Sequence, residues 1–214
     1  VYIITILCNY YNKKVEDLGL KNTSFANTVG LYDKNNYSSA YDMAQMLMYS
    51  LKNEKYDVIA VGKINDIFNG KGVTKAIRTV SNHDGMEKTI CLLDEDFTGL
   101  CFTNLVDFDA LYGHRRDLEG YKLAIEEFDQ DLKSFIDKMN DDDLVIVVAD
   151  HGNDPVHHGT DHTREIVPFI AYSKKLTGKV LADFDTFAYV GATISDNFNV
   201  KLPKIGKSVL EELK

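Results

Sequence analysis

The sequence predicts an α/β fold, and three observations favour it. Short apolar runs have the composition of buried strands, at residues 56–64, 99–109, 142–152 and 165–173. Segments with helical patterns alternate with these runs along the chain. Such alternation is typical of a sheet whose neighbouring strands run parallel. The 214 residues are enough for one ordinary domain or two small ones with a sizeable core.

The N-terminal part is polar and is expected to be mostly helical. A charged run followed by "LGL" predicts a helix over residues 9–18, because Gly commonly ends a helix. Residues 27–39 have the composition of a loop. A second helix is predicted over residues 38–53, with Ser38 or Ser39 as its N-cap.

The elements from residue 56 onward are predicted more sharply. The run at 56–64 predicts a buried strand, and residues 72–82 predict a helix before the next strand at 99–109. The clearest helix covers residues 119–140, where apolar side chains recur every three or four positions: Leu123, Phe128, Leu132, Phe135, Ile136 and Met139. Strands at 142–152 and 165–173 follow, then a helix at 187–198 and a short polar end at 204–214.

Composition excludes several classes of partner. A net charge of −9 argues against nucleic acid as a partner. Cys8, Cys91 and Cys101 have neither metal-ligand nor disulfide-scaffold spacing, so free thiols in a reducing cytoplasm are expected. No apolar run is long enough to span a membrane, and the opening "VYIITILC" lacks the preceding basic residue of a complete signal peptide. We therefore expect a cytoplasmic protein without a membrane partner.

Metal-ligand side chains gather after two of the predicted strands. Four of the six histidines lie within "VVADHGNDPVHHGTDHTREIVPF", residues 147–169. Asp150 and His151 follow one strand, and Asp109 and His114 follow the other. Ligands of open α/β sheets bind at the carboxyl ends of strands. With His162, these carboxylates and imidazoles suit manganese, zinc or a related ion, and their number suits part of a two-metal site.

The residues alone leave other interpretations open. Asp150 at a strand end is equally suited to capping the next loop, and Asp154 before Pro155 is typical of a turn. His157 and His158 are expected to be loop residues. At most one of Asp107 and Asp109 should face the site, because strand side chains alternate. A Ser-His-Asp triad is disfavoured, because the chain lacks a GxSxG nucleophile motif.

Several longer motifs occur in one order: "YDVIAVGKINDIFNGKGVT", "SNHDGMEKT", "VDFDALYGHRRD", "ADHGNDP", "GTDHTRE" and "VGATISDNF". Over about residues 48–214 they resemble the phosphopentomutases, a family of the alkaline phosphatase superfamily. The resemblance implies an alkaline-phosphatase-like core, of which this chain has the C-terminal half only. It also implies interconversion of ribose or deoxyribose 1-phosphate and 5-phosphate with two manganese ions.

The resemblance also implies roles for individual residues. Asp150 and His151 would bind one metal, and Asp109, His114 and His162 would bind the other. Lys63 would contact the sugar phosphate, unless it is a plain surface lysine. The arginines that flank the ligands would orient them or hold phosphate: Arg115, Arg116 and Arg164.

Two expected parts of a phosphopentomutase are not recognisable here. The family's phosphorylated threonine and a further aspartate ligand come from an N-terminal part that has no counterpart in this sequence. The catalytic residue is therefore unknown, and the ligand set of one ion is incomplete. Such a half-sheet should expose strand edges, so we expect marginal stability or self-association through a sheet edge.

The first stretch resembles a different family. "LGLKNTSFANTVGLYDKNNYSSAYDMA" is similar to a segment of the D-alanyl-D-alanine carboxypeptidases, over about residues 9–46. No Ser is followed three residues later by Lys, so no active-site residue is assigned from this family. We predict a carboxypeptidase-like segment at 1–47 and a partial phosphopentomutase core at 48–214. A gene fusion, a rearrangement or an assembly artefact would each explain a join near residues 46–50.

Three functional hypotheses follow. The first is a phosphopentomutase-type isomerase that acts on a small sugar phosphate. The second is a non-catalytic metal-binding fragment or chimera, favoured by the missing nucleophile. The third is a protein related to the serine-type carboxypeptidases.

Overall fold

The structure is a computed structural model, and it describes residues 15–24, 34, 42, 45–46, 48–49 and 56–213. The chain forms two compact units. The N-terminal unit consists of Val1–Tyr56, Lys71–Val73 and Leu181–Glu212. The sheet unit consists of Asp57–Gly70, Thr74–Val180 and Leu213–Lys214. The predicted boundary between residues 47 and 48 adjoins residues outside the described ranges, and it stays a prediction.

The N-terminal unit contains α6, Ala188–Asn197, which confirms the helix predicted at 187–198. The Thr193 hydroxyl accepts a hydrogen bond from Val209 N at 3.1 Å and thereby ties the C-terminal segment to α6. The short helix α7, Leu210–Leu213, follows. Residues 15–17 are helical, but the helices predicted at 9–18 and 38–53 lie mostly outside the described residues.

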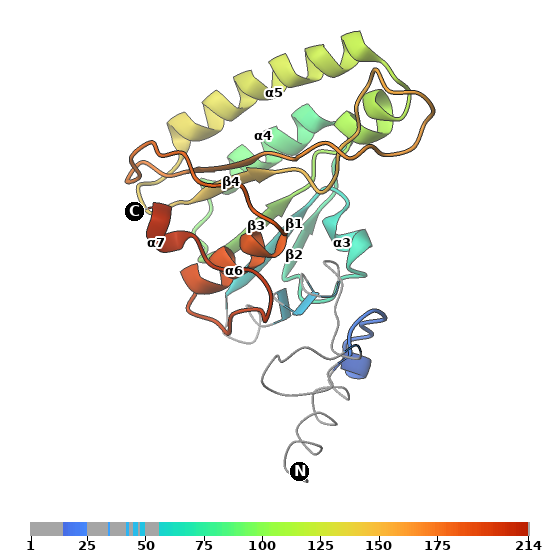
Figure 1. Ribbon diagram of the computed structural model, residues 1–214. Coiled ribbons are helices and arrows are strands. Elements are labelled where there is room, and N and C mark those ends of the chain that lie inside the picture. Colours follow the sequence, from blue (N-terminus) through green and yellow to red (C-terminus); the bar gives the residue numbers. More distant parts are fainter. Residues whose placement is uncertain are drawn as a thin grey trace. The chain divides into compact units, whose positions relative to one another are not determined.

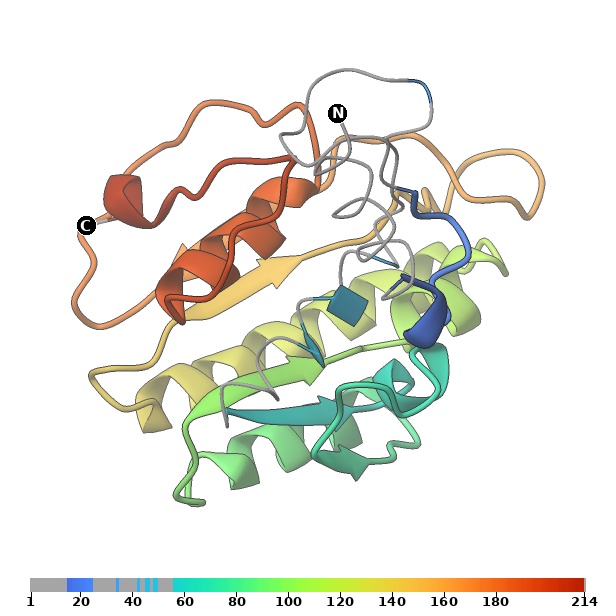
Figure 2. The same cartoon turned by 90° about the horizontal axis from the view of Figure 1, so that it is seen from below.

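The sheet unit is built around β1, Asp57–Val61, whose last four residues are buried. It pairs in parallel with β2, Lys75–Ile77, on one side and with β3, Gly99–Thr103, on the other. The parallel sheet confirms the predicted α/β class, and strands are found where 56–64 and the first half of 99–109 predict them. Figure 2 shows these strands in front of the helices that cover them.

The helix predicted at 72–82 is wrong, because this segment forms β2 and the turn that precedes a helix. Its β-branched residues fit an extended conformation, and pairing with β1 satisfies the backbone. The helix begins later, as α4, Asn82–Leu92, where the Ser81 hydroxyl accepts from Asp84 N at 3.1 Å. The short helix α3, Ile64–Ile67, follows β1.

In Figure 1, α4 lies between the strands of the sheet and α5. Apolar side chains hold it on both sides. On one side, Leu92 packs with Ile59 and Val61 of β1. On the other, Met86 packs with Phe135 and Met139 from α5, Leu118–Lys138, and its C-cap. The predicted apolar face of α5 is confirmed except at Leu123, which is 62% exposed. The core of the sheet unit thus lies between β1, α4 and α5.

The remaining strands form a separate hairpin-like pair. β4, Val145–Val148, pairs antiparallel with β5, Phe169–Tyr172, so both predicted strands exist. The expectation that 142–152 is a buried strand is wrong in part, because its side chains are half-buried and Val148 is 40% exposed. Residues 149–168 connect the two strands, and this connection carries most of the predicted metal ligands; it is called the ligand loop below.

Among the described residues, β3 pairs with β1 alone and therefore leaves one edge without a strand partner. This edge agrees with the expected self-association, which stays a prediction. None of the helices formed by the described residues has the length and apolar character needed to cross a membrane.

Candidate metal centre

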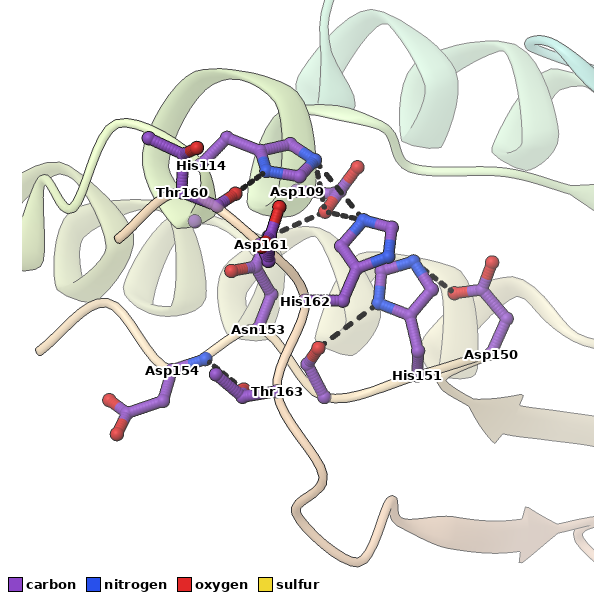
Figure 3. Close-up of polar contacts among 12 residues, drawn as sticks. Asp109, His114, Asp150, His151, Asn153, Asp154, Thr160, Asp161, His162 and Thr163 are labelled. Atoms are coloured by element: carbon purple, nitrogen blue, oxygen red, sulfur yellow. Dashed lines mark hydrogen bonds and ion pairs between the residues drawn. The ribbon is translucent and has the colours of Figure 1, made fainter. Parts of the chain in front are cut away.

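The first wall of the site is a π-helix instead of the end of a strand. β3 stops at Thr103, and η1, Phe108–Gly113, follows. Asp107 Oδ2 accepts from Asn82 N at 2.7 Å, while Asp107 N donates to Asn82 Oδ1 at 2.9 Å, so Asp107 secures the start of α4. Asp109 faces the histidines instead (Figure 3). One aspartate faces the site as expected, but helical geometry rather than strand alternation is the cause.

The second wall is the ligand loop, which folds back on itself. Gly152 and Thr163 form an isolated antiparallel bridge, and Asp154 N donates to the Thr163 hydroxyl at 2.8 Å. This closure brings His151 and His162 together although eleven positions separate them along the chain. Their rings stack with centroids 3.7 Å apart and planes inclined by 21°. The loop therefore presents two imidazoles side by side.

The two walls converge at one carboxylate oxygen (Figure 3). Asp109 Oδ1 lies 3.3 Å from His162 Nε2 and 3.4 Å from His114 Nε2, and these two nitrogens are 3.1 Å apart. Asp109, His151 and His162 each offer a ligand atom, and these atoms lie within 4.8 Å of one another. A carboxylate oxygen and imidazole nitrogens are ligands that manganese, zinc and related ions accept. The donor set therefore fits a metal ion.

Hydrogen bonds to backbone carbonyl oxygens orient the rings of His114 and His151. His114 Nδ1 contacts the Thr160 carbonyl oxygen, and His151 Nδ1 lies 3.2 Å from the Gly152 carbonyl oxygen. A carbonyl oxygen only accepts, so Nδ1 is the donor in each contact. In the neutral ring, Nε2 then keeps its lone pair, which is the arrangement that a metal-binding histidine needs.

The structure distributes the predicted ligands differently from the two expected sets. His151 lies with Asp109 and His162, and His114 approaches the same aspartate oxygen. The Asp150 side chain is 87% exposed, with Oδ1 3.7 Å from His151 Nε2, and it lies outside the three-residue group. Lys63 is exposed beyond the end of β1 and lines a cavity of about 160 Å³ together with Thr79, Ser81 and Asp107.

The other polar residues of the ligand loop have simpler positions. His157 and His158 are exposed, with ring centroids 6.4 Å apart. Asp154 Oδ1 accepts from Val156 N at 2.9 Å, which confirms its predicted role in a turn. Among the described residues, no serine hydroxyl is hydrogen-bonded to a histidine, so this part of the chain contains no Ser-His pair of a catalytic triad.

Sequence reasoning missed two residues that support the cluster. Asn153 Nδ2 donates to Asp109 Oδ1 at 2.6 Å. Gly113 makes room for this contact, because a Cβ there would lie 2.5 Å from Asn153 Nδ2 and 2.8 Å from the Phe108 carbonyl oxygen. Both residues lie within the motifs quoted above, but only the folded chain shows that they meet.

Comparison with protein families agrees with this chemistry. Residues 60–202, more than half of the chain, match the model of the metalloenzyme superfamily. The chain therefore belongs to the metalloenzyme superfamily. Membership indicates a metal-dependent enzyme with chemistry of the phosphoryl-transfer type.

A second match covers residues 7–92 and is to the D-alanyl-D-alanine carboxypeptidase family. It spans less than half of the chain and overlaps the first match over residues 60–92. This match is a similarity of the N-terminal part, and it extends into the metalloenzyme region.

Proposed function

We propose that this chain is a phosphopentomutase-type isomerase, whose reaction moves a phosphoryl group between the 1- and 5-positions of ribose or deoxyribose. The convergence of Asp109, His151 and His162 carries the proposal, because carboxylate and imidazole donors that suit a metal ion meet where η1 contacts the ligand loop. The motifs that resemble phosphopentomutases supply the substrate class.

The proposed site holds manganese. Asp109, His151 and His162 would bind one ion, with His114 directed at the same carboxylate, and Asp150 would contribute to a second ion. When bound, such ions neutralise phosphate charge and activate an attacking oxygen. The protein's contribution is to hold the Nδ1 atoms of His114 and His151 against backbone carbonyl oxygens, so that in the neutral rings Nε2 keeps its lone pair.

Substrate binding is assigned to cationic side chains near this point of the sheet unit. Lys63 projects from the end of β1, and Arg164 is exposed in the ligand loop. An ammonium or guanidinium group pairs well with phosphate oxygens. The nucleophile is not assigned, so metal binding and turnover are separate tests of the proposal.

The first test compares His162→Ala with the exposed loop variant His157→Ala, on the full chain. We expect His162→Ala to weaken manganese binding at least tenfold, since it removes one ligand, and His157→Ala to leave the affinity within a factor of about two. Isothermal titration with MnCl₂ measures both affinities. Equal affinities in wild type and His162→Ala would show that the ligand assignment is wrong.

Turnover is then measured with a coupled assay for ribose 5-phosphate formed from ribose 1-phosphate. Manganese-dependent turnover that disappears in His162→Ala supports the isomerase. Metal binding without turnover supports the alternative, a non-catalytic metal-binding fragment.

A carboxypeptidase-related function is the second candidate, and the match at residues 7–92 favours it. The chain lacks the S-x-x-K element of that chemistry. Covalent labelling by a fluorescent penicillin would support this candidate, and no labelling above a heat-denatured control would count against it.

A further inference from the structure

Arg116 makes an unusual set of contacts beside the metal centre. It lies between η1 and α5, two residues after His114, and it is half-buried. Its guanidinium donates to five oxygens of the sheet unit: Asn153 Oδ1 and the carbonyl oxygens of Gly113, Asp154, Gly159 and Asp161. Nη1 lies 2.7 Å from both Asn153 Oδ1 and the Asp154 carbonyl, and Nη2 lies 2.6 Å from the Asp161 carbonyl.

All five acceptors are neutral. A guanidinium has five N–H groups, so these contacts occupy most of its donor capacity. Among the described residues, Arg116 forms no ion pair with a carboxylate. A phosphate-binding arginine needs free donors that point to solvent or to the ligand. The contacts of Arg116 therefore point to a role in holding the protein's own backbone.

Four of the five acceptors belong to residues 153–161, the part of the ligand loop between His151 and His162. The guanidinium contacts this segment near both of its ends, at Asn153 and at Asp161. His162 follows directly, so the position of its ring depends on where the segment is held. His114 adds a parallel contact from the same wall, through Thr160.

Asn153 links Arg116 to the metal ligand. Its Oδ1 accepts from Arg116 Nη1, and its Nδ2 donates to Asp109 Oδ1 at 2.6 Å. Because Arg116 only donates, it fixes the amide with its oxygen toward the guanidinium and its NH₂ group toward Asp109. The carboxylate that converges with the histidines is thus oriented through two hydrogen bonds that start at Arg116.

The backbone at Arg116 is adapted to this role. Its φ of 55° lies in the left-handed region, which a non-glycine residue occupies at some cost. Arg116 N donates to the Gly113 carbonyl at 3.1 Å, and Asp117 then caps α5. This left-handed residue lies in the four-residue connection between η1 and α5, and its side chain bridges back to the ligand loop.

We propose that Arg116 is a positioning residue of the metal centre, which holds residues 153–161 so that His162 and Asn153 meet Asp109. It acts through the loop and does not bind phosphate. Arg115, next to it in sequence, is exposed and makes no hydrogen bond or ion pair among the described residues, which makes it a matched control. This inference rests on the proposed metal-binding function.

The experiment uses the full chain with Arg116→Ala, Arg116→Lys and the control Arg115→Ala. We expect Arg116→Ala to weaken manganese binding about 10- to 100-fold in isothermal titration, as is typical for groups that orient metal ligands. Arg116→Lys should recover part of this loss at most, because a lysine cannot reach five dispersed acceptors. Arg115→Ala should leave the affinity within about twofold.

Two further readouts separate positioning from a general loss of structure. Millimolar methylguanidinium should partly restore manganese affinity to Arg116→Ala and should have no effect on Arg115→Ala. Without metal, hydrogen exchange should accelerate in Arg116→Ala within peptides that cover residues 153–163, while peptides from α4 and α5 keep their protection. If Arg116→Ala fails to fold, Arg116→Lys and Asn153→Ala replace it, and both should show the loss of affinity and the local acceleration.

The outcomes distinguish the two proposals. If wild type binds no manganese, the proposed function fails, and metal-free hydrogen exchange still decides whether Arg116 holds the loop. If wild type binds manganese and Arg116→Ala matches Arg115→Ala in affinity and exchange, the inference about Arg116 is overturned while the metal site stands.

Discussion

The core of the sheet unit and the ligand loop are held together by different interactions. In the core, β1 buries residues Val58–Val61 almost completely, and α4 packs between this strand and α5. The ligand loop contributes few apolar contacts, and its Val156 and Ile166 side chains are 65% and 89% exposed. Hydrogen bonds from Arg116, His114 and Asn153 fix it instead.

This difference separates stability from metal binding. Burial of apolar surface contributes free energy to the whole unit, whereas a network of hydrogen bonds mainly selects one arrangement of a few groups. Substitutions in the core should therefore lower the free energy of unfolding. Substitutions in the network should lower metal affinity while the unit stays folded.

The largest expected effect is a loss of stability caused by a substitution in the core. Phe135 contributes a buried ring to the cluster with Met86 and Met139, so Phe135→Ala should destabilise the protein by about 3–5 kcal/mol. Chemical denaturation followed by circular dichroism measures this loss. The control Leu123→Ala, on the exposed face of the same helix, should cost less than about 0.5 kcal/mol.

The difference between the core and the ligand loop also predicts the metal affinity of Phe135→Ala. Under conditions where Phe135→Ala is folded, its manganese affinity should remain within about threefold of wild type. If the manganese affinity fell in proportion to the free energy of unfolding, the core and the ligand loop would be coupled. Stability and metal binding would then not depend on separate parts of the unit.

A smaller effect is expected from Gly113→Ala, on the side of the ligand loop. The added Cβ would collide with Asn153 Nδ2 and with the Phe108 carbonyl, so the amide must move away from Asp109. We expect roughly tenfold weaker manganese binding and a stability cost of about 1–3 kcal/mol. Gly178→Ala is the matched control, because a Cβ there meets open space. Equal affinities of the two variants would show that the Asn153–Asp109 contact does not matter for the site.

The sequence predicted the core better than the boundaries of its elements. Continuous apolar runs indicated β1 and β3, and the three- and four-residue spacing indicated α5. The local pattern at 72–82 favours a helix, and this prediction is wrong. Pairing with β1, a tertiary contact that the local pattern does not contain, decides the conformation of the segment. A local signal for α4 was present, because Ser81 and Asp84 form an S-x-x-D capping pattern.

The site was predictable in its chemistry and not in its geometry. Residue types near the ends of two strands indicated a metal centre, and the structure brings Asp109, His114, His151 and His162 together. The roles of Asn153 and Arg116 depend on contacts between residues 37 or more positions apart. No spacing rule links such pairs, so only the fold of the ligand loop against η1 reveals them.

The smallest expected effect tests a polar contact that lies away from the metal centre. His83 of α4 contacts Asp131 of α5, with Nδ1 2.9 Å from Oδ2, and Glu87 and Glu127 also face it. The hydrogen bond and charge of Asp131 raise the pKa of His83 above its ordinary value of 6.5. A raised pKa in the folded state stabilises the protein below the unfolded pKa, and this contribution disappears as pH rises through the folded pKa.

His83→Gln keeps hydrogen-bonding capacity and removes the titratable charge. The difference in unfolding free energy between wild type and His83→Gln should therefore be larger at pH 5.5 than at pH 8.5. Because the His83 side chain is about half-exposed, the change should stay within a few tenths of a kcal/mol. Denaturant titrations at the two pH values measure it, with the double variant His83→Gln/Asp131→Asn as control. A difference that is independent of pH would show that the contact adds packing alone, and the α4–α5 pair would then be held by apolar burial throughout.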